Sequence, residues 1–194
     1  MKVDIIKEDT DILVFRLTDI TISLANALRR IMLSDIPNIA IDDVIIHKNT
    51  TVMCDEIIAH RLGLIPLKYN GDYNELKNLH ALSIRLTCTC NDMHINTVYS
   101  NKLNIQDSRC ELLSGDIPIV KMIKGQELDI ELFTSTGTHN DHSKWSYVTS
   151  CYYKILSENQ VEFFVESVGC YSPREILKRA FIELKEKVKQ MHYD

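Results

Sequence analysis

The sequence predicts an α+β protein in which a mainly antiparallel β region lies between two amphipathic helices. Three observations support this fold class. Apolar residues recur at helical spacing near both ends of the chain, at 24–32 and again at 177–191. Between them, the stretch from 82 to 155 alternates apolar and polar residues and is interrupted by turn-forming clusters, which is typical of short antiparallel strands.

Two strands are expected before the first helix. Val3 and Ile5 alternate with charged residues, and Leu13, Phe15 and Leu17 form a second alternating run. The polar cluster between the two runs is a natural turn. The amino-terminal segment therefore predicts a half-buried antiparallel pair.

The first helix is expected over 24–34, with Thr21 or Ser23 as its cap. It ends there because Pro37 lacks an amide donor and disfavours helical geometry in the residue before it. Its apolar stripe includes Leu24, Leu28 and Ile31. Its other faces carry Asn26, Arg29 and Arg30. Exposed basic residues are usually only solvated, so their placement alone does not establish a function.

A strand over 39–46 and a second helix over 55–62 are expected next. The helix carries acidic residues in its first turn and basic residues in its last, an arrangement that the helix dipole stabilises. These residues are Asp55, Glu56, His60 and Arg61. Gly63 and Pro66 follow and end the helix.

The last helix has the strongest local signal in the chain. Ser172 and Glu175 form a capping box, and Pro173 occupies the first helical position. The apolar residues that follow alternate at spacings of four and three, the rhythm of a helix that lies along another helix. They are Leu177, Phe181, Leu184, Val188 and Met191. Periodicity alone leaves open whether they pack on the protein's own sheet or on a partner, but so long a stripe should not stay exposed.

The composition is that of a globular protein without a secretory or membrane segment. Hydrophobic residues make up 45% of the 194 residues and charged residues 25%. No apolar run is long enough to span a bilayer and no signal sequence is seen at the start, so an intracellular, nuclear or cytoplasmic protein of a cell or a virus is expected. The net charge of −5 argues against a surface that grips phosphate backbones.

No catalytic or metal-binding constellation is predicted. Cys88, Cys90 and His94 invite comparison with a zinc site, but a second ligand pair is missing nearby and zinc needs four converging ligands. Cys54 and His60 lie six residues apart, which places them on different helical faces. The chain also lacks a glycine-rich phosphate loop and a serine-centred elbow. We therefore expect no cofactor, no metal and no catalytic residues.

Several motifs resemble those of one family. The segments NALRRIM (26–32), IAID (39–42) and CDEIIAHRLGLIPL (54–67) are similar to the signature of the assembly subunit of cellular RNA polymerases. That family includes the third subunit of eukaryotic polymerase II, its archaeal counterpart and, more distantly, the bacterial alpha amino-terminal domain. The resemblance continues downstream in the family's order, at NTVYS (96–100), KGQEL (124–128), HSKW (142–145) and FVESVG (164–169).

The resemblance implies a fold in which both chain ends build one domain. An antiparallel sheet and two helices, from 1–37 and 158–194, would form a dimerisation domain, and 38–157 would form an inserted, mainly β domain. The first and last helices would pack against a smaller alpha-like subunit. The implied dimerisation residues are Leu24, Leu28, Ile31, Leu177, Phe181, Leu184, Val188 and Met191.

The resemblance also implies a role in polymerase assembly. Docking of the second-largest polymerase subunit and of small assembly subunits is expected at Asn26, Arg29, Arg30, Asp55, Glu56, His60 and Arg61. The expected function is a non-catalytic scaffold in transcription, without direct contact to nucleic acid or membrane. Two rivals are an enzyme that uses Cys54 or the histidines, and a stand-alone homodimer that binds nucleic acid through Arg29 and Arg30. Homodimer and heterodimer are not distinguished by the residues.

Overall fold

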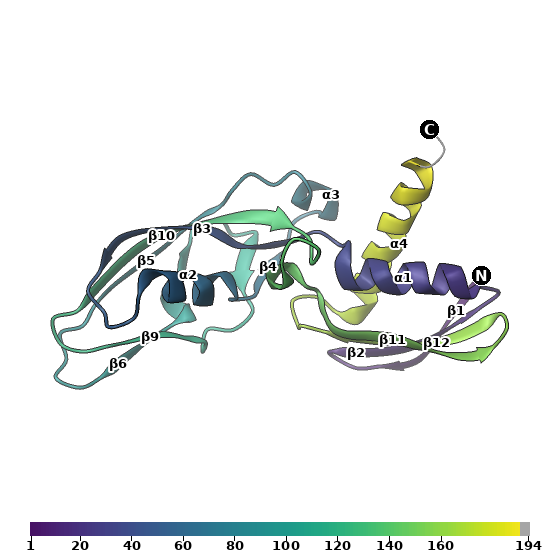
Figure 1. Ribbon diagram of the computed structural model, residues 1–194, viewed down its shortest axis with the longest axis horizontal. Helices are drawn as coiled ribbons and strands as arrows, with labels where there is room; N and C mark the ends of the chain where they lie inside the picture. The colour runs from purple at the N-terminus through teal and green to yellow at the C-terminus, as the bar shows by residue number, and fades with distance from the viewer. Residues whose placement is uncertain (191–194) are drawn as a thin grey trace. The chain divides into compact units, whose positions relative to one another are not determined.

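The computed structural model describes residues 1–190 and confirms a mixed α+β fold (Figure 1). The chain divides into two compact units. Unit 1 contains residues 1–38 together with the segment from Thr138 onward, and unit 2 contains Ile39–Gly137. Among residues 1–190, no helix combines the length and the apolar character that crossing a membrane requires.

Unit 1 is built on a four-stranded antiparallel sheet to which both ends of the chain contribute. The strand order is β1-β2-β12-β11, with β1 at Lys2–Glu8, β2 at Ile12–Thr18, β12 at Gln160–Ser167 and β11 at Val148–Ser157. Phe15 of β2 lies opposite Phe163 of β12, and their rings stack with centroids 5.0 Å apart. This pair is fully buried and forms the centre of the unit's core.

Two helices belong to unit 1: α1 (Ile22–Ser34) and α4 (Pro173–Gln190). Figure 1 shows α1 lying along the sheet and α4 extending away from it. The Thr21 hydroxyl caps α1 by accepting a hydrogen bond from the Leu24 amide at 3.3 Å. Ser172 caps α4 in the same way, accepting from the Glu175 amide at 3.3 Å. Both helices therefore start at caps that the sequence predicts.

The boundary between the units differs from the expected one. The sequence placed 138–157 in the inserted domain, whereas the structure places this segment in unit 1. The reason is β11, which pairs with β12 from Val148 opposite Ser167 to Ser157 opposite Gln160. Because β11 is a strand of the unit 1 sheet, it belongs to the core of unit 1. The inserted unit therefore ends earlier than expected, at Gly137.

Unit 2 is mainly β and contains one four-stranded sheet and two strand pairs. The sheet has the order β3-β10-β5-β7, with β3 at Asn38–Asn49, β10 at Glu127–Gly137, β5 at Ser83–Thr89 and β7 at Asn104–Ile105. The pairs are β4 (Leu67–Tyr69) with β8 (Cys110–Leu112), and β6 (Asn96–Tyr99) with β9 (Pro118–Met122). The helical segments are α2 (Asp55–Gly63), α3 (Tyr73–Leu76) and the short 3-10 turn η1 (Ser100–Lys102); a second 3-10 turn, η2 (Ser143–Trp145), precedes β11 in unit 1.

A buried polar network fixes α4 within unit 1. The Tyr147 hydroxyl donates a hydrogen bond to the Pro37 carbonyl at 2.8 Å, and Nη1 of Arg179 donates to the Tyr147 oxygen at 2.8 Å. The Arg179 guanidinium also lies over the Tyr171 ring, 3.9 Å from its centroid. Burial raises the pKa of Tyr147, so its hydroxyl keeps the proton that it donates. The network joins α4 to the segment that follows α1.

A second link joins the far ends of the two helices. Asp35, directly after α1, forms an ion pair with Lys187 in the last turns of α4. The Asp35 carboxylate also accepts hydrogen bonds from the Ser34 hydroxyl at 2.7 Å and the Asn140 amide at 3.1 Å. Burial opposes ionisation of this carboxyl, but the three donors outweigh it, and the pKa of Asp35 is lowered.

The Asp35 cluster predicts a pH-dependent contribution to stability. Because the folded-state pKa is lowered, the contribution is present above the unfolded-state pKa and is lost as pH falls through the folded-state value. We expect Asp35→Asn to lower the free energy of unfolding at neutral pH by about 0.5–1 kcal/mol, discounted because Lys187 is nearly half exposed. Urea denaturation at several pH values measures this. Asp4→Asn, in the exposed pair with Lys2, should have no such effect; a pH-independent loss at Asp35 would contradict the prediction.

The Tyr147 network predicts a larger effect. Tyr147→Phe removes a buried hydroxyl and leaves the Pro37 carbonyl and one Arg179 donor without that partner. We expect the free energy of unfolding to fall by about 1–3 kcal/mol. Thermal or urea denaturation checks this, with Tyr152→Phe as the control because the Tyr152 side chain is exposed. Equal stability of the Tyr147→Phe variant and the parent would contradict it.

Candidate assembly surfaces

The polar face of α1 carries three predicted docking residues. Asn26 and Arg30 are exposed, and Arg29 is half-buried. The Asn26 side-chain oxygen accepts hydrogen bonds from Nε and Nη2 of Arg29, at 3.2 and 2.9 Å. This contact holds the Arg29 guanidinium against the helix. The other N–H groups of the guanidinium do not take part in it. A positioned guanidinium is well suited to bind a carboxylate at an interface.

The four predicted docking residues of α2 lie in unit 2, so the structure describes them separately from those of α1. Glu56 and His60 are exposed. The other two are held by contacts inside the unit. Asp55 accepts a hydrogen bond from the Asn49 amide at 2.6 Å, and Nη1 of Arg61 donates to the Ile119 carbonyl at 2.8 Å. Arg61 thus anchors α2 to β9, a structural contact that the sequence does not reveal.

Exposed apolar residues accompany the charged face of α2. Ile58 and Leu62 are buried and form its inner stripe. Val52, in the loop before the helix, is 89% exposed, and Ile57 on the helix is also exposed. The sequence does not predict a site role for either residue. The sequence contains only a weak sign that these residues are exposed. Ile57 lies off the inner stripe of the helix, and Val52 is an apolar residue in a polar loop.

The expected dimerisation residues fall into a buried set and an accessible set. Leu28, Ile31 and Leu177 are buried within the chain itself and are not available to a partner. Leu24 and Val188 are exposed, and Phe181 and Leu184 are half-buried. Met191 lies outside the described residues. The apolar stripe of α4 therefore begins inside unit 1 and becomes accessible towards the end of the helix.

The sheet adds apolar residues to this accessible set. Val3 and Ile5 of β1 lie opposite Leu17 and Phe15, so they share the helix-bearing face of the sheet. Leu17 and Phe15 are fully buried, yet Val3 and Ile5 are exposed. The same is true at the other edge, where Ile155 lies opposite the buried Val161. The hydrophobic face of the sheet is therefore wider than its own helices cover.

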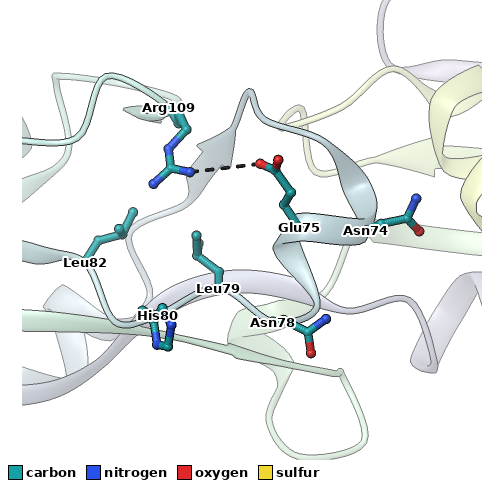
Figure 2. A pocket seen from close by; sticks show the side chains of 7 residues that line it. All are labelled: Asn74, Glu75, Asn78, Leu79, His80, Leu82 and Arg109. Carbon is teal, nitrogen blue, oxygen red and sulfur yellow. Dashed lines mark ion pairs between the residues drawn. The ribbon is translucent and has the colours of Figure 1, made fainter.

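A pocket of about 500 Å³ in unit 2 has Glu75, His80 and Arg109 in its lining. Figure 2 shows Arg109 facing Glu75 across it, with a closest ion-pair distance of 4.0 Å. Arg109 also forms a bidentate pair with Asp107, at 3.1 and 2.8 Å, which lowers the pKa of Asp107 to about 2. The charged groups are thus engaged with one another. The rest of the lining is two asparagines, two leucines and His80, and it contains no serine or cysteine.

The possible metal ligands are dispersed in the part of the chain that the structure describes. Over residues 1–190, no group of three or more His, Cys, Asp or Glu side chains is arranged to hold a metal ion. All six cysteines are free thiols. Burial raises the pKa of Cys110 and of Cys151 to about 12, so these thiols stay protonated and are poor nucleophiles.

Comparisons with known proteins identify the family of this chain. Residues 14–188 match the family described as the RNA polymerase Rpb3/Rpb11 dimerisation domain. The chain is 41% identical to DNA-directed RNA polymerase subunit Rpo3 of Methanocaldococcus jannaschii over 86% of this chain and 81% of that protein. It is 30% identical to the RNA polymerase II subunit rpb3 of Dictyostelium discoideum, over 94% and 72%. Against Rpo3 of Pyrococcus horikoshii the identity is 38% over 75% of this chain, which spans about half (56%) of that relative.

Proposed function

We propose that this chain, which belongs to the RNA polymerase Rpb3/Rpb11 dimerisation-domain family, is a non-catalytic assembly and scaffold subunit of a DNA-directed RNA polymerase. The observation that carries the proposal is a family match that runs through both units, from residue 14 to residue 188. The relatives' names place those proteins in DNA-directed RNA polymerases. Nucleotide chemistry would then belong to other subunits of the complex, and an intracellular site, nuclear or cytoplasmic, would follow.

The first proposed partner is a smaller alpha-like subunit that covers unit 1. The support is the set of accessible apolar side chains in unit 1: Leu24, Phe181, Leu184 and Val188 on the two helices, and Val3, Ile5 and Ile155 at the edges of the sheet. Large apolar side chains exposed on two helices and on the helix-bearing face of a sheet mark a protein interface. A partner that placed its own helices there would complete the hydrophobic core.

The second proposed role is docking of the second-largest subunit and of small assembly subunits. Arg29 and Arg30 on α1 present guanidinium donors. On α2, Asp55 and Glu56 present carboxylates in the first turn, and His60 and Arg61 lie in the last turn. Arginine forms planar, bidentate pairs with carboxylates and is enriched at interfaces. A homodimer that binds nucleic acid through the same arginines is disfavoured by the net charge of −5.

Pairing with the smaller subunit is tested at Val188. This side chain is 47% exposed, so Val188→Asp should leave the fold intact but place a charge in the proposed dry interface. We expect at least about tenfold weaker pairing, measured by co-purification and size-exclusion chromatography of the co-expressed subunits. Lys189→Ala, the adjacent exposed position, should pair normally. Normal pairing of Val188→Asp would contradict the assignment of α4.

Docking of the second-largest subunit is tested at the α1 arginines. The double change Arg29→Ala and Arg30→Ala should reduce its co-purification about tenfold, because removing charged partners from an interface weakens it strongly. Quantitative mass spectrometry of tagged complexes measures this. The smaller subunit should still co-purify, and Lys178→Ala, an exposed cation on α4, serves as the matched control. An unchanged subunit ratio in the double variant would exclude these arginines from docking.

A further inference from the structure

One end of unit 2 carries three strongly exposed apolar side chains. Met93 is 79% exposed, Ile95 69% and Ile123 53%. Asn96 lies opposite Met122 in the β6–β9 pair, which places Ile95 and Ile123 opposite each other one step further along the ribbon. The Lys124 ammonium lies 3.4 Å from the Met93 sulfur, so Met93 belongs to the same surface. We call Met93, Ile95 and Ile123 the ribbon patch.

The ribbon patch makes no contribution to the core of unit 2. Along a strand, successive side chains point to opposite faces. The inward face of this ribbon carries Val98, Val120 and Met122, all buried. The outward face carries Ile95 and Ile123, so these isoleucines lie on the solvent side of the ribbon. Exposed aliphatic residues gathered in this way mark an interaction surface.

A hollow of about 250 Å³ lies between β5 and β6, and its lining includes Asn96 and Met122, the chain neighbours of Ile95 and Ile123. It exists because β7 pairs only with Ile84 and Arg85 of β5, so β5 has no neighbouring strand on that side beyond Arg85 among the described residues. The hollow is smaller than the roughly 300–1,000 Å³ of a small-molecule site and fits a side chain. Its polar lining includes Thr87, Thr89, Asn96, Thr97 and Lys102.

The charges around the patch favour an anionic partner. Lys102, Lys121 and Lys124 are exposed, and none forms an ion pair with another residue in 1–190. Asp92 lies in the same loop as Met93, and the Asp129 carboxylate next to the hollow is already paired with Arg85 at 3.1 Å. This end of unit 2 is therefore locally basic, although the chain as a whole carries a net charge of −5. Unpaired cations beside an apolar patch attract a segment that offers both carboxylates and apolar side chains.

We propose that this end of unit 2 is a docking site for an acidic segment of another protein in which carboxylates alternate with large apolar side chains. A carboxylate enters the hollow, where the Lys102 ammonium and the hydroxyls of Thr89 and Thr97 can donate hydrogen bonds to it. The Thr87 hydroxyl is already engaged, because it donates to Asp129 at 3.0 Å. The neighbouring apolar side chains cover Ile95, Ile123 and Met93. The site is formed by residues other than the α1, α2 and α4 residues assigned to assembly, so it serves an additional partner.

The probe is a fluorescein-labelled synthetic peptide in which glutamate alternates with leucine and phenylalanine. Its binding to the full chain is followed by fluorescence anisotropy, with a second peptide carrying glutamine in place of glutamate. We expect the glutamate peptide to bind at least about tenfold more tightly, and its affinity to fall as salt is raised. Equal affinity for the two peptides would overturn the proposal.

Variants place the binding site. Lys102→Glu and the double change Ile95→Ser with Ile123→Ser should each weaken binding of the glutamate peptide about tenfold. Lys154→Glu, an exposed lysine on β11 in unit 1, should bind as the parent does. Because all changed side chains are exposed, circular dichroism should show an unaltered fold. If Lys102→Glu and the Ile95→Ser, Ile123→Ser double variant both bound the peptide as the parent does, the peptide would bind elsewhere and the proposal would be overturned.

Two further outcomes separate this site from other functions. A single-stranded RNA oligonucleotide that bound more tightly than the peptide, and lost binding in Lys102→Glu, would make the surface a nucleic-acid site and overturn the proposal. The Val188→Asp variant, which tests assembly, should bind the glutamate peptide normally. Peptide binding that required Val188 would also overturn it, whereas failure of the assembly test alone would leave the ribbon site standing.

Discussion

The pairing of β2 with β12 is the contact on which unit 1 depends. It joins residues 12–18 to 160–166, so two segments separated by most of the chain become neighbours. The stacked rings of Phe15 and Phe163 lie at its centre, fully buried. Long-range pairing of this kind closes a large loop at an entropic cost. Unit 2 occupies that loop, and its own sheet gives the inserted segment a separate core.

Much of the local structure is predictable, because its signals are local. The helix caps at Thr21 and Ser172 follow from capping chemistry and are confirmed. The unit boundary is less predictable. β11 has a strand pattern like those of unit 2, and only its register with β12 assigns it to unit 1. Alternation shows that a strand has a buried face, but it does not show which core buries it.

The same limit applies to the assembly surface. Leu177 and Val188 belong to one apolar stripe in the sequence, yet the first is buried in the chain's own core and the second is exposed. Periodicity identifies the stripe, while the point at which the sheet stops covering it depends on tertiary packing. Val3 and Ile5 illustrate the reverse case. Their alternation predicts burial, and they remain exposed because the helices of unit 1 do not extend over that edge.

The two accessible apolar surfaces differ in their relation to the core, and this difference bears on how each would be used. The surface of unit 1 is an open margin of its hydrophobic core, since Val3 and Ile5 continue rows that contain Leu17 and Phe15. A partner there would share the core, as in obligate interfaces. The ribbon patch lies outside the core of unit 2, and lysines flank it. A small patch with a charged rim is typical of weaker, salt-sensitive contacts that form and dissociate after a unit has folded. Permanent assembly through unit 1 and reversible docking through unit 2 are therefore physically compatible in one chain.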